Sequence, residues 1–304
     1  RVVEAHLYKP KIQMLTSRWT RGQKAAVPTG SQDLSDFMAE PALKNQVLNI
    51  AEQIKKARES GENLKNVMFY GVPGTGKTMC AQAIAGYAGI DWVLTSGSEF
   101  AKLKDQNQAV EELHKLIRWS RKSKKGLMIF IDEAESFLCD RTSPSATKWS
   151  IDMLNAFLQA VPEPTSQNIM FIFATNHPFK IDRAVMDRIG DSLEFTLPTP
   201  AIREEIIKLY SARSTEGKNL PIAQSFMDQL PTLSRMLDGV SPRRIKYAVG
   251  EAVREARMIG ETELTFKRAE EAIEREKTLA STKQRWVRER DRWETRSTAA
   301  AAAA

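Results

Sequence analysis

The chain has 304 residues, 42% of them hydrophobic and 27% charged, with a formal net charge of +7. This is the composition of a globular protein, and the length suffices for one large domain or two smaller ones. No stretch approaches the roughly 18–20 uninterrupted apolar residues of a membrane-spanning helix, so we expect no membrane span in this chain.

The cysteines and histidines indicate neither a disulfide framework nor a metal site. Cys80 and Cys139 have no zinc-binding spacing, and we expect both to be reduced thiols. The three histidines are scattered along the chain, without partners at the spacing of metal ligands. A metal site built on these histidines is therefore not expected.

The N-terminal residues 1–32 are basic and interrupted by proline and glycine, so we expect an irregular, extended arm. Residue 1 is Arg rather than Met, so we expect a processed or incomplete product, and the absence of a targeting peptide or an N-terminal membrane segment here proves nothing. The stretch 41–60 predicts a helix, because apolar residues recur there at steps of three and four.

Short apolar runs and helical stretches alternate over the next part of the chain. Strands are expected at 66–70, 92–95, 126–131, 169–174 and 192–197, and helices at 79–88, 109–123 and 150–161. Two of these strands are continuously apolar, as expected for a parallel sheet covered on both faces. Residues 33–198 are therefore predicted to form an α/β domain, an αβα sandwich with a parallel sheet.

After residue 198 the pattern predicts helices alone. They are expected at 201–213, 222–237, 241–259 and 266–279. We therefore predict a small all-α lid domain at 199–280 and a C-terminal helix or tail at 281–304. Trp286 and Trp293 lie seven residues apart in this tail, on one helical face. We expect a docking helix, with a stacking platform for nucleic acid as the alternative.

The most informative motif is GVPGTGKT at Gly71–Thr78, between a predicted strand and a predicted helix. This context is what a phosphate-binding P-loop needs. Its three glycines allow backbone N–H groups to face the β-phosphate at the positive end of the helix. Lys77 is expected to reach the β- and γ-phosphates, and the Thr78 hydroxyl to bind Mg²⁺.

Polar residues at the ends of two other strands complete a set that could hydrolyse a nucleotide. The strand 126–131 is followed by Asp132 and Glu133, the Walker B pattern. Asp132 is expected to hold Mg²⁺ through its water shell, and Glu133 to polarise the attacking water. Asn176 follows the strand 169–174 and would help to fix that water. Ligands of such sheets bind outside the carboxyl ends of the strands, which is where these residues fall.

The ordered motifs GVPGTGKT, IFIDEAESF, FIFATN and IDRAVMDR resemble an AAA+ ATPase of the AAA clade over about residues 33–275. The segments 34–50, 67–78, 126–141 and 239–245 are most similar to the mitochondrial ATAD-three group. Members of that group carry an N-terminal coiled coil and an inner-membrane segment. The resemblance therefore implies a mitochondrial location on the matrix side, in association with the inner membrane.

The resemblance also implies roles for individual residues. Asn176 falls at the sensor 1 position, and Arg188 at the position of an arginine finger that reaches the next subunit's nucleotide. Many relatives have two arginines in this segment, whereas here Asp187 precedes Arg188 and the segment is shorter. Arg243 falls at the sensor 2 position of the lid. At the pore-loop position, 101–104, the chain lacks the aromatic residue and the glycine of translocating relatives, so peptide threading is not supported.

These patterns give one expected site with ATP and Mg²⁺ as cofactors. The expected catalytic residues are Glu133, Lys77, Asn176 and Arg188, and the expected Mg²⁺ ligands are Thr78 and Asp132. The expected nucleotide-binding residues are Gly71, Val72, Pro73, Gly74, Thr75, Gly76, Lys77, Thr78, Met79, Asp132 and Arg243.

The leading interpretation is a Mg²⁺-dependent ATPase that works as a hexameric ring and remodels a protein or membrane-associated assembly. The alternative is an ATP-bound factor with little or no hydrolysis inside a larger complex such as a ribonucleoprotein. The expected partners are like subunits or a larger multiprotein complex, with a protein client. The basic run at 115–125 is expected to be a solvated helix face, and contact with RNA or an anionic membrane is the alternative.

Overall fold

The computed structural model describes residues 15–16, 34, 37–98, 111, 126–143, 146–161, 165–166, 169–217 and 220–303. The chain divides into two compact units, Arg1–Thr196 and Leu197–Ala304. Most of the expected N-terminal arm, the helix at 109–123 except residue 111, the pore-loop position and the basic run at 115–125 lie outside the described residues.

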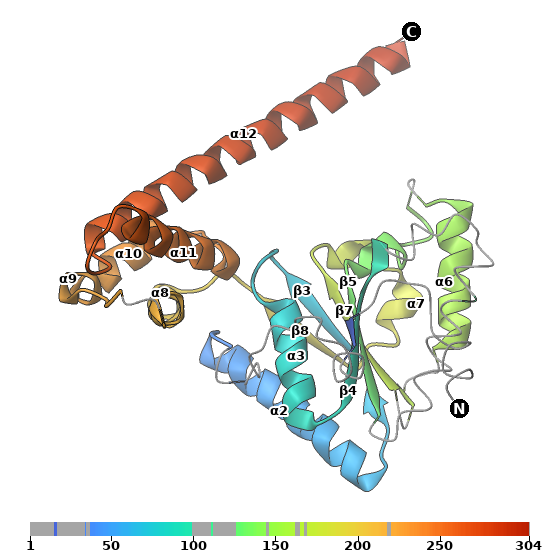
Figure 1. Ribbon diagram of the computed structural model, residues 1–304. Coiled ribbons are helices and arrows are strands. Elements are labelled where there is room, and N and C mark those ends of the chain that lie inside the picture. Colours follow the sequence, from blue (N-terminus) through green and yellow to red (C-terminus); the bar gives the residue numbers. More distant parts are fainter. Residues whose placement is uncertain are drawn as a thin grey trace, which may run out of the picture. The chain divides into compact units, whose positions relative to one another are not determined.

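The first unit is built on a mainly parallel sheet (Figure 1). Its parallel strands lie side by side in the order β4 (Asp91–Ser96), β5 (Leu127–Asp132), β7 (Ile169–Thr175), β3 (Val67–Gly71) and β8 (Asp191–Phe195). Three short antiparallel strands flank them: β1 (Leu15–Thr16), β2 (Leu64–Lys65) and β6 (Thr165–Ser166). The predicted αβα fold with a parallel sheet is confirmed.

The central strands form where apolar residues run continuously. All seven residues of β7 are buried, as are the first five of β5. The last strand, β8, ends at Phe195, although the sequence predicts a strand to residue 197. The proline at 198 lacks a backbone N–H and cannot continue the sheet, so the chain leaves it early. β1 pairs with β4, so two residues of the predicted irregular arm are a strand.

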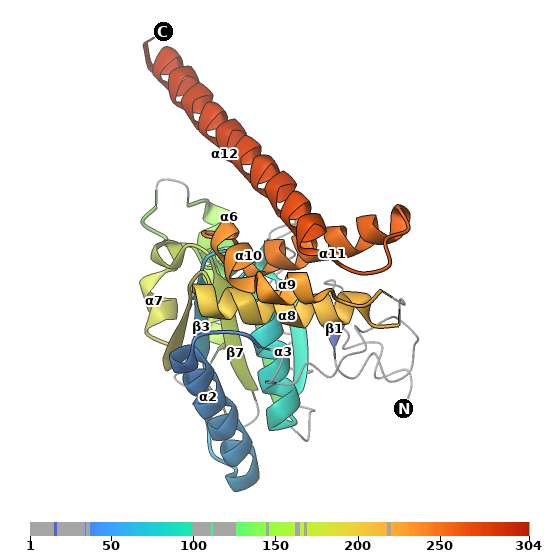
Figure 2. The ribbon, with the colours of Figure 1, turned by 90° about the vertical axis from the view of Figure 1, so that its left-hand side faces the viewer.

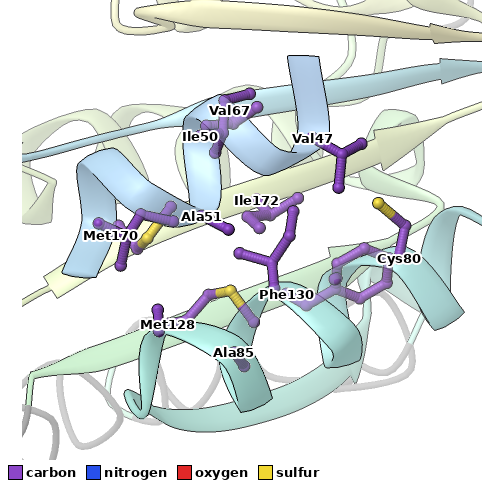
Figure 3. Close-up of a cluster of buried hydrophobic side chains, with 14 of the residues drawn as sticks. Val47, Ile50, Ala51, Val67, Cys80, Ala85, Met128, Phe130, Met170 and Ile172 are labelled. Atoms are coloured by element: carbon purple, nitrogen blue, oxygen red, sulfur yellow. The ribbon is translucent and has the colours of Figure 1, made fainter. Parts of the chain in front are cut away.

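Helices cover both faces of the sheet (Figure 1). On one face α2 (Pro41–Ser60) and α3 (Lys77–Ala88) pack on a cluster that includes Phe130 and Ile172 (Figure 3). On the other face α6 (Lys148–Ala160) and the short α7 (Arg183–Met186) cover a second buried cluster. Because both faces are covered, polar groups that follow the carboxyl ends of the strands lie at an uncovered edge of the sheet.

The second unit is mainly helical, as predicted (Figure 2), but the helix predicted at 266–279 continues without a break through the predicted tail at 281–304. Its helices are α8 (Pro200–Thr215), α9 (Gln224–Asp228), α10 (Leu230–Met236), α11 (Pro242–Met258) and α12 (Phe266–Ala303). The single helix predicted at 222–237 is divided into α9 and α10, because the proline at 231 cannot donate the hydrogen bond that would continue it. In the described part of the chain no helix is long and apolar enough to cross a membrane.

Candidate nucleotide-binding site

The predicted phosphate-binding loop joins the end of β3 to the start of α3. Gly71, Gly74 and Gly76 have φ values of +130°, +81° and +103°, which residues with a side chain rarely adopt. Gly76 precedes the first helical residue, and no side chain caps the helix there. The first N–H groups of α3 therefore meet the requirements of an anion-binding helix end.

The loop is tied to the neighbouring strand β8. The N–H of Val72 donates to the carbonyl oxygen of Phe195 at 3.2 Å. A Cβ placed on Gly71 would lie 2.2 Å from the same oxygen, so only glycine allows this approach. Within the loop, the hydroxyl of Thr75 donates to the carbonyl of Val72 at 2.8 Å. These contacts fix the shape of the loop before any ligand binds.

Lys77 and Asn176, which lie 99 positions apart in the sequence, meet beside this loop. The Lys77 ammonium donates to Asn176 Oδ1 at 2.9 Å, and to the carbonyl oxygens of Gly71 at 2.9 Å and Val72 at 3.0 Å. The Lys77 side chain is buried, with the residue only 7% exposed. Asn176 follows β7, the neighbour of β3 in the sheet, which explains why it reaches the loop.

Thr78 and Asp132 form the expected metal-binding pair. The Thr78 hydroxyl lies in the first turn of α3 and donates to Asp132 Oδ2 at 3.4 Å. Both residues are half-buried. A hydroxyl and a carboxylate are the hard oxygen ligands that Mg²⁺ prefers, and they lie next to a loop shaped for phosphates. The donor set therefore fits a nucleotide-bound Mg²⁺.

Glu133 follows Asp132 in a strained turn. Its φ of +51° makes it the one non-glycine residue with positive φ among those the structure describes. Its N–H donates to Asp132 Oδ1 at 3.0 Å, and its carbonyl accepts from the N–H and hydroxyl of Ser136 at 2.9 and 2.8 Å. A backbone conformation of this kind costs about 1–3 kcal/mol, and these hydrogen bonds keep Glu133 in it. The side chain itself is exposed at the edge of the sheet.

The sequence analysis did not identify two residues that support these groups. A Cβ on Gly97 would lie 2.5 Å from the carbonyl oxygen of Glu133, so a glycine after β4 gives the Glu133 turn its room. Phe37 is 2% exposed, and its ring lies 3.5 Å from the position of a Cβ on Gly76, behind the loop. In the sequence, Gly97 could have been noticed as a glycine that follows an apolar run, and Phe37 as an apolar residue that precedes α2.

The remaining predicted residues are placed as follows. Val72 and Pro73 are exposed in the loop, while Gly74 and Met79 are half-buried. Arg243 is exposed in the first turn of α11, in the second unit, so its role at the nucleotide stays a prediction.

The expected arginine finger is engaged within its own unit. Arg188 follows α7 and is half-buried. Its guanidinium donates to the carbonyl oxygens of Ala184 at 2.8 Å and Leu158 at 3.4 Å. To act on another subunit's nucleotide, Arg188 would have to exchange these bonds for contacts with that nucleotide.

The chain is similar to proteins of a known ATPase family. Residues 67–197 match the ATPase family associated with various cellular activities (AAA). The chain is 32% identical to ATPase family AAA domain-containing protein 3-A of Xenopus laevis over 261 residues, which is 81% of this chain and 44% of the relative. It is 36% identical to ATPase family AAA domain-containing protein 3 of Caenorhabditis elegans over 219 residues, 69% of this chain and 36% of the relative. The chain thus spans less than half the length of these curated relatives.

Proposed function

The chain belongs to the AAA family of ATPases, and we propose that it hydrolyses ATP with Mg²⁺ at the site formed by β3, β5 and β7. The observation that carries this proposal is the convergence of Lys77 with Asn176, and of Thr78 with Asp132, around one glycine-rich loop. Glu133 directly follows Asp132, so all five groups belong to one edge of the sheet.

Each group at this site has a separate role in the proposed reaction. N–H groups of the loop and of the first turn of α3 bind the phosphates, and the Lys77 ammonium exchanges its carbonyl and amide acceptors for phosphate oxygens. Thr78 and Asp132 would hold the metal, Asp132 through the water shell of the ion. When bound, Mg²⁺ would neutralise charge that develops on the phosphates. Glu133 orients and polarises the attacking water, and Asn176 fixes the position of that water beside Lys77.

ATP turnover of the variant Glu133→Gln tests the proposal. The amide cannot accept a proton from water, so we expect turnover to fall by about 100-fold or more while nucleotide binding is retained. The matched control is Glu62→Gln, which removes an exposed carboxylate from the same unit, after α2, and should leave the rate unchanged. Equal rates for Glu133→Gln and wild type would remove Glu133 from this role.

We further infer that the active form is a ring of like subunits, a hexamer, that remodels a protein or membrane-associated assembly on the matrix side of mitochondria. Membership of the AAA family supports assembly, and the proposed location rests on the resemblance of segments such as 67–78 and 126–141 to the mitochondrial ATAD-three group. In such a ring Arg188 would complete the neighbour's site. Native mass measurement in MgATP should then give one homogeneous assembly.

One observation favours a second function, that of an ATP-bound factor inside a larger complex, such as a ribonucleoprotein, with little turnover. Arg188 already donates to two carbonyls of its own unit, so in a lone subunit it serves local structure. If this is correct, the protein stays monomeric in MgATP, and Arg188→Ala lowers stability without lowering turnover. A ring instead requires that Arg188→Ala lower turnover, by about 1,000-fold where such fingers have been measured.

A further inference from the structure

The chain between Asn176 and Arg188, here called the 176–188 segment, connects two groups with different targets. Asn176 contacts Lys77 at the chain's own phosphate-binding loop. Arg188 is the group proposed to act on a neighbour's nucleotide. The contacts that hold this segment therefore fix the position of Arg188 relative to the chain's own nucleotide-binding site.

The middle of the 176–188 segment is joined to the chain that follows Glu133. Cys139 and Ile181 form an antiparallel bridge. The N–H of Asp140 donates to the carbonyl of Lys180 at 2.8 Å, and the N–H of Asp182 donates to the carbonyl of Leu138 at 2.9 Å. The Glu133 turn and the 176–188 segment are thus connected by backbone hydrogen bonds.

A bidentate ion pair strengthens this connection. Arg141 donates from Nε to Asp182 Oδ2 and from Nη2 to Oδ1, each at 2.9 Å, and its N–H donates to Oδ2 at 3.2 Å. Asp182 is 3% exposed, and its Oδ1 also accepts the N–H of Ala184 at 2.9 Å, which caps α7. The Arg141 guanidinium holds the pKa of Asp182 below its usual range. One buried carboxylate therefore fixes both Arg141 and the start of α7.

The far end of the segment is anchored as well. The side chain of Asn66, just before β3, donates from Nδ2 to the carbonyl of Arg188 at 3.1 Å and accepts the N–H of Phe171 at 2.9 Å. Asn66 is 3% exposed. The backbone of Arg188 is thereby fixed to the sheet at one end of α7, while the Arg141–Asp182 pair holds the other end.

We propose that Arg141 and Asp182 are positioning residues that couple the Glu133 turn to the segment bearing Arg188. Through them, the group that acts on a subunit's own nucleotide and the group that acts on its neighbour's nucleotide move together. This inference rests on the proposed function, namely hydrolysis in an assembly in which Arg188 acts between subunits. Planar, two-point contact restricts the relative rotation of the two segments, which a single lysine–carboxylate contact would not do.

The test is a kinetic double-mutant cycle on the full chain. Arg141→Ala and Arg141→Lys are each made alone and together with Arg188→Ala, and ATP turnover is followed as a function of ATP concentration. Each single variant at Arg141 should lower kcat by about tenfold, with binding of a fluorescent ATP analogue within about threefold of wild type. Because Arg141 acts through Arg188, adding an Arg141 substitution to Arg188→Ala should cause no further loss.

Two further measurements separate positioning from folding. Arg254→Ala removes an exposed arginine that pairs with Glu251 in α11, and should leave kcat unchanged. Arg141→Lys keeps the positive charge beside Asp182, so it provides the same test if Arg141→Ala does not fold. The thermal midpoint of unfolding of each variant shows whether a loss of rate only follows a loss of stability.

Three outcomes would overturn the inference. The first is a wild-type kcat in both Arg141 variants, and the second is a double variant whose loss of kcat is the product of the two single losses. The third is a loss of nucleotide affinity as large as the loss of kcat. Failure of the proposed function is seen separately. In that case Glu133→Gln turns over ATP at the wild-type rate, or Arg188→Ala does, and the coupling proposed here falls with it.

Discussion

Replacing Gly71 by alanine perturbs the point where β3 enters the phosphate-binding loop. The backbone of Gly71 has a φ of +130°, and a Cβ would lie 2.2 Å from the carbonyl oxygen of Phe195 and 2.9 Å from its carbonyl carbon. Both atoms belong to the backbone of β8, so they cannot rotate away as a side chain could. Either the two strands separate or the start of the loop changes its conformation.

The magnitude follows from two terms. Forcing a residue with a Cβ into this backbone region costs about 1–3 kcal/mol. Separation of the strands also breaks the hydrogen bond from Val72 to Phe195, which has a length of 3.2 Å and contributes about 0.5–1.5 kcal/mol. We therefore expect the free energy of unfolding of Gly71→Ala to fall by about 1.5–4.5 kcal/mol. The displaced loop should also bind nucleotide more weakly.

Urea denaturation measures the first effect and calorimetric titration with MgATP the second. Gly61→Ala is the matched control, because Gly61 ends α2 with a φ of +74° but a Cβ placed on it would have no neighbour within 4 Å. The free energy of unfolding of Gly61→Ala should fall by only about 1–2 kcal/mol, which is the cost of the left-handed backbone conformation, and this variant should bind nucleotide normally. If Gly71→Ala is no less stable than Gly61→Ala, the close approach of the loop to β8 is not the constraint described here.

Two further predictions concern titrating groups. The pKa of Asp182 is held low by Arg141, so its contribution to stability is present above the ordinary carboxyl value of about 3.9 and is lost as the pH falls through the folded-state pKa. Urea titrations should therefore show a difference in free energy of unfolding between wild type and Asp182→Asn that is constant near neutral pH and shrinks below about pH 4. A difference that stays the same as the pH falls further would contradict the role of the ion pair. Burial raises the pKa of the Cys80 thiol well above its usual range, so iodoacetamide at about pH 8 should alkylate Cys139 and spare Cys80 in the native protein, with both modified in urea. Rapid native labelling of Cys80, detected by mass spectrometry, would show that α3 opens.

Local patterns were sufficient to predict much of this molecule. The loop at Gly71–Thr78 could be assigned because its glycines, lysine and threonine are consecutive and lie between an apolar run and a helix. Helix α2 has the predicted bounds because its buried residues follow the period of a helix and a glycine with positive φ ends it. Where a single residue altered the local hydrogen bonding, prediction was poorer, as at the early end of β8 and the division between α9 and α10.

The amino-acid sequence by itself determined which chemical groups are available to bind a nucleotide and which strands carry them, because those signals span only a few consecutive residues. Tertiary structure alone decided that Asn66 anchors the backbone of Arg188, 122 positions away, and that Arg141 pairs with Asp182, 41 positions away. Such contacts depend on the order of the strands and on how the intervening turns are held. The sequence spacing of two residues in contact predicts neither the order of the strands nor the conformation of the turns.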